Sequence, residues 1–113
     1  MTKIFCDSST HEACIVIEGQ KTTIIPYPKP VTNNVGEYQA VILGVEKAIQ
    51  LEAKDAEILT DSLLVVNQVN GSWKCRMPHL LPFRDKVGGL LENSRITLEW
   101  VPREENLAGK VLG

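Results

Sequence analysis

The sequence has no apolar run near the ~20 residues that a membrane-spanning helix needs, and its first residues lack the apolar core of a secretory leader. We therefore expect a cytoplasmic protein without a membrane partner. The 113 residues are enough for one compact domain and too few for two. The prediction is a single domain over residues 1–113.

Cysteine and histidine are scarce. Cys6, Cys14 and Cys75 include no Cys-x-x-Cys pair of the kind found in zinc or redox sites. Cys6 and Cys14 lie in apolar segments, where a thiol packs as a small hydrophobic group, so we expect both in the core. His11 and His79 lie far apart and are expected on the surface. A metal site in this chain would therefore have to use oxygen ligands.

The chain also lacks an excess of positive charge, because its net charge is −2 at pH 7. This argues against a protein that holds nucleic acid by bulk electrostatics alone. Lys74, Arg76, Arg84 and Lys86 nevertheless cluster around the single acid Asp85. The cluster predicts either a surface that contacts phosphates or a solvated helix face.

The hydrophobic periodicity predicts an α/β fold. Three strands joined by tight turns form an antiparallel meander, and two later strands, each reached through helices, add in parallel. The result is a five-stranded mixed sheet with helices on both faces. We expect strands at 2–7, 12–18, 21–30, 56–60 and 95–101, helices at 36–53, 62–70 and 79–93, and at most a short helix in 104–113. Pro26, Pro28 and Pro30 place the third strand at a sheet edge.

The helix at 36–53 carries an acid beside its apolar face. That face consists of residues at helical spacing: Tyr38, Val41, Ile42, Val45, Ala48 and Ile49. Glu37 borders this face, and Asn34 is a candidate cap for the helix. Glu37 is therefore predicted to point along the edge of the sheet.

Two aspartates follow strands directly. Asp7 ends the first strand and Asp61 ends the fourth, so both are expected at the carboxyl edge where reactive groups gather in such sheets. With Glu37 they would form an anionic cluster that a cation makes tolerable. Carboxylate ligands favour Mg²⁺ or Mn²⁺, and two such ions suit phosphodiester hydrolysis. The alternative for Asp61 is a cap for the helix that begins at Ser62.

Four segments together resemble a type 1 ribonuclease H over nearly the whole chain: Asp7-Ser8-Ser9, Thr32-Asn33-Asn34-Val35-Gly36-Glu37-Tyr38, Thr60-Asp61-Ser62 and Arg103-Glu104-Glu105-Asn106. The resemblance implies a monomeric enzyme with the ribonuclease H-like fold and no protein partner. It would cleave the RNA strand of RNA/DNA hybrids endonucleolytically with two Mg²⁺ or Mn²⁺ ions, leaving 5′-phosphate and 3′-hydroxyl ends.

The resemblance also implies roles for single residues. Asp7, Glu37 and Asp61 would be catalytic metal ligands. The residues implied in substrate binding are Ser8, Thr32, Asn33, Asn34, Ser62, Asn67, Trp73, Lys74 and Arg103. Of these, Ser62 and Asn67 would read 2′-hydroxyls, which separate RNA from DNA. Trp73 and Lys74 would lie against the DNA strand, although Trp73 could equally be a partly buried anchor.

The chain departs from the family pattern in its last segment. The usual fourth carboxylate lies four residues beyond the loop asparagine, where this chain has Lys110. The nearest oxygen donors are Glu104, Glu105 and Asn106, and we expect Asn106 to be the catalytic and metal ligand, at the cost of weaker metal binding. The usual loop histidine is absent, and Arg103, which cannot act as a base near neutral pH, occupies the equivalent stretch. The basic handle of some members is missing too.

Two other functions fit parts of this pattern. The first is a catalytically weak or inactive ribonuclease H-like module that binds RNA/DNA hybrid. The second is a proofreading exonuclease on the same fold, but such enzymes place an Asp-x-Glu pair on the first strand, whereas here Asp7-Ser8 is followed by Ser9. The hybrid-cleaving enzyme is the preferred interpretation.

Overall fold

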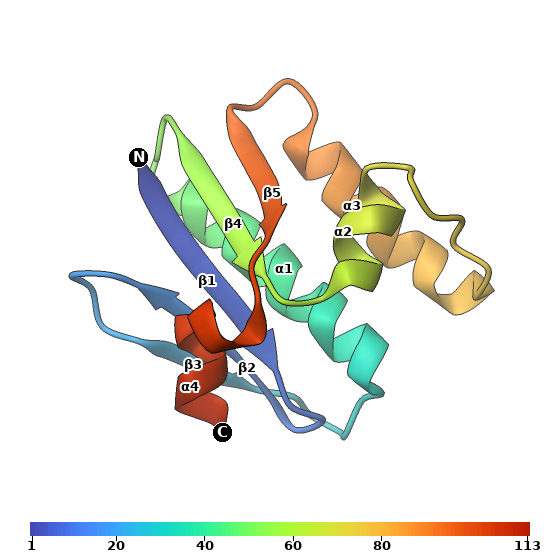
Figure 1. Ribbon diagram of the computed structural model, residues 1–113, viewed down its shortest axis with the longest axis horizontal. Coiled ribbons are helices and arrows are strands. Elements are labelled where there is room, and N and C mark those ends of the chain that lie inside the picture. Colours follow the sequence, from blue (N-terminus) through green and yellow to red (C-terminus); the bar gives the residue numbers. More distant parts are fainter.

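Five strands form one mixed sheet in the computed structural model, which describes residues 1–113 (Figure 1). The strands are β1 (Thr2–Ser8), β2 (Glu12–Ile17), β3 (Thr23–Pro26), β4 (Ala56–Thr60) and β5 (Ile96–Trp100). Their order is β3-β2-β1-β4-β5, with an antiparallel meander from β1 to β3 and parallel pairing of β1 with β4 and of β4 with β5. The predicted fold class and topology are confirmed.

Helices cover both faces of the sheet, as predicted. The bounds are α1 (Asn33–Gln50), α2 (Leu63–Val69), α3 (Leu81–Leu91) and α4 (Leu107–Leu112), with short 3-10 turns η1 (Pro78–Leu80) and η2 (Arg103–Glu105). The first three helices pack on one face, and α4 alone lies on the other (Figure 1). None of these helices is both long enough and apolar enough to cross a membrane.

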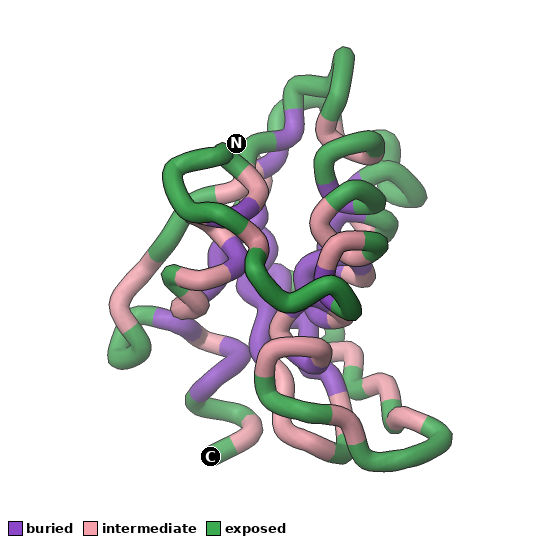
Figure 2. The backbone as a smooth tube through the Cα atoms, turned by 90° about the vertical axis from the view of Figure 1, so that its right-hand side faces the viewer, coloured by how far each residue is buried: buried purple, intermediate pink, exposed green.

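The two faces bury different amounts of apolar side chain. Successive strand residues point to opposite faces, so Ile4 and Cys6 of β1 enter the core under α1, whereas Phe5 enters the core under α4. The α1 side holds 17 buried core residues and the α4 side holds four. Figure 2 shows this buried centre in purple, between the outer, largely exposed turns of the helices. Cys6 and Cys14 are both fully buried, as expected.

The third strand is shorter than predicted. β3 spans Thr23–Pro26 rather than residues 21–30, and it lies at a sheet edge as its prolines require. Pro28 and Pro30 follow the strand and have no N–H to donate to a ladder. The proline pattern thus fixed the edge position correctly, but it also ended the strand early.

The start of α1 corrects two details of the prediction. Thr32, not Asn34, is the N-cap, because its hydroxyl accepts a hydrogen bond from Val35 N at 3.3 Å. The helix then begins at Asn33 and ends at Gln50. Ile49 was assigned to the buried face but is 48% exposed, whereas Ala48 beside it is fully buried.

Candidate metal centre

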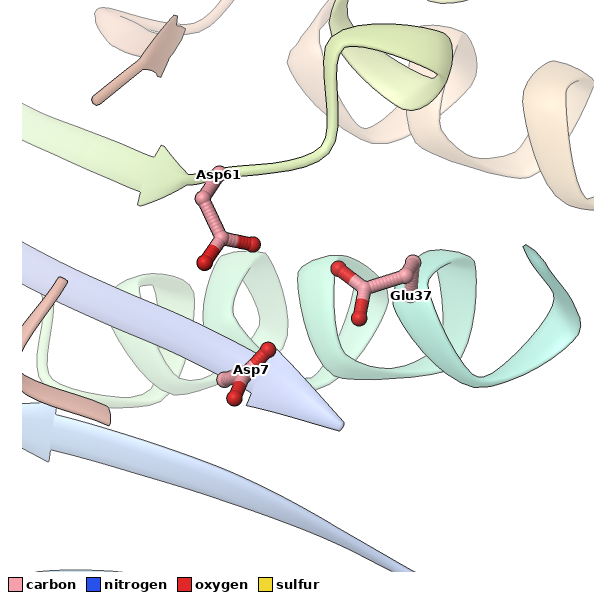
Figure 3. A group of neighbouring side chains, drawn as sticks. All are labelled: Asp7, Glu37 and Asp61. Carbon is pink, nitrogen blue, oxygen red and sulfur yellow. The ribbon is translucent and has the colours of Figure 1, made fainter. Parts of the chain in front are cut away.

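Three carboxylates meet where β1, β4 and the first turns of α1 come together (Figure 3). Each of Asp7, Glu37 and Asp61 offers one oxygen, and these oxygens all lie within 4.8 Å of one another. Phe5 and Leu59 are partners in the parallel β1–β4 register, and the two aspartates each lie two residues further on. Parallel pairing therefore delivers both acids to the same edge, as the sequence predicted.

Glu37 reaches the group from the other direction, because α1 starts close to the end of β1. Gly36 makes this approach possible, since a Cβ at position 36 would overlap Ser8 Oγ and would lie 3.2 Å from both Ser8 Cβ and Ser9 O. Tyr27 joins the same contact, with its hydroxyl 2.7 Å from Ser8 Oγ and donating to Gly36 O at 3.3 Å. Ser8 is thus accommodated by a glycine on α1.

The carboxylates are poorly compensated by hydrogen bonds. Asp7 is 1% exposed, and its Oδ1, like Oε2 of Glu37, is buried without any hydrogen-bond partner. Burial, together with the charges of Asp7 and Asp61, raises the pKa of Glu37 to about 8. Burial also raises the pKa of Asp7. Orphaned buried oxygens are rare in proteins, and a hard divalent cation would satisfy them, so the donor set fits Mg²⁺ or Mn²⁺.

Arg103 is the cation that lies in this group. Its Nη1 donates to Asp61 Oδ2 at 3.0 Å and lies 3.7 Å from Asp7 Oδ2, while its side chain stays 63% exposed. It comes from the η2 turn that precedes α4. The sequence marked Arg103 as a substrate contact, and the structure places it against two of the three acids.

The geometry does not support Asn106 as the replacement for the fourth carboxylate. Asn106 is fully buried, its amide donates to Cys6 O at 2.9 Å, and its oxygen accepts from Ala108 N at 3.1 Å as the N-cap of α4. The nitrogen of the amide therefore ties α4 to β1, and its oxygen caps α4. Glu104 and Glu105 are exposed on η2 and stand outside the acidic group.

The residue of α4 that faces the acids is Gly109. A Cβ at this position would lie 3.5 Å from Asp7 Oδ2 and 3.7 Å from Arg103 Nη1, whereas Lys110 is exposed. The family spacing predicted Lys110, four residues beyond Asn106, at the position of the fourth carboxylate and did not predict Gly109. The available signal was a glycine inside an otherwise helix-forming segment, which often marks a close approach.

The predicted substrate residues surround the acids without joining them. Thr32, Asn33 and Asn34 form the exposed to half-buried entry of α1. On α2, the Ser62 hydroxyl accepts from Val65 N at 3.2 Å, so Ser62 and not Asp61 caps that helix. Asp61 is therefore free for the group in which it lies.

The remaining predicted contacts follow Ser62 along the chain. Asn67 is half-buried on α2, and its carbonyl accepts from Trp73 N at 3.0 Å. Trp73 is 48% exposed, and Lys74 beside it is exposed as well. Trp100 was not singled out from the sequence, yet its indole donates to Asp61 O at 3.3 Å and so steadies the backbone of one acid from β5.

Known proteins resemble this chain in sequence and in fold. A family model described as reverse transcriptase-like matches residues 6–112. The crystal structure of RNase H1 from the halophilic archaeon Halobacterium salinarum NRC-1 is similar with a TM-score of 0.80 at 26% identity, over 98% of this chain and 92% of that chain. The chain is a reverse transcriptase-like member of the ribonuclease H family.

Two further ribonuclease H-like proteins resemble this family member. The "Bifunctional protein Rv2228c" of Mycobacterium tuberculosis is 45% identical over 76 residues, which are 66% of this chain and 21% of that protein. The chain thus spans about a fifth of the length of this curated relative. LC11-RNase H1, solved in complex with an RNA/DNA hybrid, shares the fold with a TM-score of 0.77 at 23% identity, over the full length of both chains.

Proposed function

We propose that this chain is a metal-dependent endoribonuclease that hydrolyses the RNA strand of RNA/DNA hybrids to 5′-phosphate and 3′-hydroxyl ends. The observation that carries the proposal is the group of Asp7, Glu37 and Asp61, whose oxygens lie within 4.8 Å and include two buried, unpartnered atoms. Membership of the ribonuclease H family supports a nuclease. The LC11 enzyme, which was solved with an RNA/DNA hybrid, supports this class of substrate.

Asp7, Glu37 and Asp61 would hold the metal. When bound, one or two Mg²⁺ or Mn²⁺ ions supply the activation of water and the stabilisation of charge on the phosphate. Glu37 must release its proton to take part, because its pKa of about 8 leaves it largely protonated at neutral pH in the metal-free protein. Trp100 keeps Asp61 in place through the hydrogen bond to its carbonyl.

The half-buried and exposed side chains around the acids would bind the hybrid. Ser62 and Asn67 on the α2 side would meet 2′-hydroxyls of the RNA strand. Thr32, Asn33 and Asn34 at the entry of α1 would meet its backbone. Trp73 and Lys74, both exposed after α2, offer an aromatic face and a cation for the DNA strand.

The proposed site has three carboxylates instead of the four usual in the family. Gly109 offers no ligand where α4 faces Asp7, and Asn106 is committed to the fold. We therefore expect a higher metal requirement than that of a four-acid enzyme. The second candidate is a weak or inactive module that binds hybrid. The contacts of Arg103 favour it, because this arginine already compensates part of the negative charge of the acids.

Cleavage of an end-labelled RNA/DNA hybrid across Mg²⁺ and Mn²⁺ series separates the two candidates. The enzyme is expected to cut the hybrid and not an all-DNA duplex, with activity lost in Asp61→Asn. Asp55→Asn is the matched control, since Asp55 is an exposed aspartate at the other end of β4. Binding of hybrid without cleavage at every metal concentration would replace the enzyme with the binding module.

A further inference from the structure

Arg103 takes the place in the acidic group where a metal ion would find two of its ligands. Its Nη1 is 3.0 Å from Asp61 Oδ2 and 3.7 Å from Asp7 Oδ2. Figure 3 shows the side chain of Asp61 extending from the end of β4 toward β1, where Asp7 lies. The same two oxygens would be ligands of a bound metal ion. The guanidinium has only hydrogen-bond donors and keeps its positive charge at any ordinary pH.

Gly109 lies beside the guanidinium of Arg103. A Cβ at position 109 would lie 3.7 Å from Nη1 and 3.8 Å from Cζ of Arg103, which is ordinary contact distance. A side chain longer than alanine would point from α4 toward the volume beside the guanidinium and Asp7. Arg103 and Gly109 therefore belong to one arrangement, in which the cation comes from the protein.

The compensation by Arg103 is incomplete and loosely held. Oδ1 of Asp7 and Oε2 of Glu37 remain without hydrogen-bond partners, so an ion still has oxygens to approach. The arginine side chain is 63% exposed and so has a path to solvent, whereas the side chains of Asp7 and Asp61 are only 1% and 10% exposed. Arg103 can therefore leave the acids without disturbing the core.

We propose that Arg103 is a displaceable internal cation that competes with the divalent metal for Asp7 and Asp61 in the free protein. This inference rests on the proposed metal site. Metal binding then includes the release of Arg103 to solvent, where a phosphate of a bound nucleic acid would be its next partner. Metal and nucleic acid would each favour the other, because both favour the state with Arg103 withdrawn.

The test is Mn²⁺ binding by the protein without nucleic acid, measured by calorimetry or by the electron paramagnetic resonance signal of free Mn²⁺. Arg103→Gln is expected to bind Mn²⁺ about tenfold more tightly than the unmodified protein. Arg103→Lys is expected to lie between the two, because it keeps the charge but replaces the planar guanidinium, whose Nη1 contacts both acids, with a shorter and more flexible ammonium. Arg84→Gln is the control, since Arg84 pairs with Asp85 on α3 and its loss changes the net charge equally.

Thermal unfolding in the same samples gives a second measurement. In EDTA, Arg103→Gln is expected to unfold at a lower temperature than the unmodified protein. Mn²⁺ is expected to raise the unfolding temperature of Arg103→Gln by more than it raises that of the unmodified protein. Equal or weaker Mn²⁺ binding by Arg103→Gln would overturn the competition while leaving the metal site in place. Failure of every variant to bind millimolar Mn²⁺ would instead overturn the metal site and the proposed function.

Discussion

The face of the sheet under α1 holds 17 buried core residues, whereas the face under α4 holds four. The 18-residue α1 and the helices beside it cover the first face, and the second is covered by a helix of six residues. The residues that match the family pattern lie mainly on elements that pack in the larger core. The departures at the fourth carboxylate and at the loop histidine lie in the segment that closes the smaller face, whereas the missing basic handle belongs to the region between α2 and α3.

This difference links packing to chemistry. Asp61 directly follows β4, and Glu37 lies near the start of α1. A change of sequence could shift these two elements only by disturbing the larger core. Arg103 and Gly109 lie on η2 and α4, where few apolar contacts constrain the backbone. Stability therefore limits change on the α4 side of the site far less than on the α1 side, and substitutions can measure that contrast.

The largest effect is expected at the acids. Asp7→Asn should lower hybrid cleavage by at least ~1,000-fold, about 4 kcal/mol of activation free energy, because a neutral amide is a poor ligand for Mg²⁺. The metal-free fold should be no less stable, since the change removes a buried charge whose Oδ1 has no partner. Cleavage assays and urea denaturation in EDTA check the two halves. A loss of activity that merely follows unfolding would contradict the assigned role.

The next effect is a difference between the two cores in the unfolding free energy lost on truncation of a side chain. Ile58→Ala removes a fully buried side chain of the larger core and should cost roughly 3–4 kcal/mol of unfolding free energy. Leu112→Ala trims a partly buried residue of α4 and should cost only about 1 kcal/mol. Urea denaturation at pH 7 measures both. Equal losses would mean that the α4 segment is as firmly fixed as the rest, which would break the comparison.

A smaller effect is expected from a carboxylate added on the α4 side. Gly109→Asp should lower the metal concentration at half-maximal cleavage by about tenfold, because the new side chain points at the site from 3.5 Å away. Lys110→Asp is the matched control and should change the midpoint little, since Lys110 is exposed. The reverse ranking would restore Lys110 as the position equivalent to the fourth carboxylate.

The last predicted effect is a slope of stability against pH. Glu37 has a pKa of about 8 in the folded protein and an ordinary value of 4.5. The folded state therefore holds a proton that the unfolded state loses, so the free energy of unfolding should fall as pH rises from 4.5 towards 8. Glu37→Gln should flatten this fall in EDTA, whereas Glu46→Gln, an exposed position on the same helix, should not. Chemical denaturation across that pH range provides the measurement.

The sequence predicted what depends on local pattern. Asp7 and Asp61 were placed correctly because each lies at the carboxyl end of an apolar strand, and parallel pairing brings these two ends to the same edge. Glu37 was placed by its register against the apolar face of α1. The sheet order followed from tight turns between the first three strands and from helical crossovers afterwards.

What the sequence could not predict depends on contacts between distant segments. Asn106 looked like a free oxygen donor because nothing nearby shows that its amide holds the Cys6 carbonyl, 100 residues away. Arg103 could be placed on a loop, but the direction of a long exposed side chain follows from the charges it meets in the fold. Gly109 was not predicted, because the spacing from Asn106 does not show which side of α4 faces Asp7.

The contact between Ser8 and Gly36 constrains how this chain could have evolved. The two positions are 28 residues apart in sequence, yet a side chain at 36 and the hydroxyl of Ser8 would claim the same volume. A lineage with a larger residue at position 36 could reach serine at position 8 only after glycine was in place. Among relatives, the residues at these two positions should therefore vary together, and their pairing would record the order of the two substitutions.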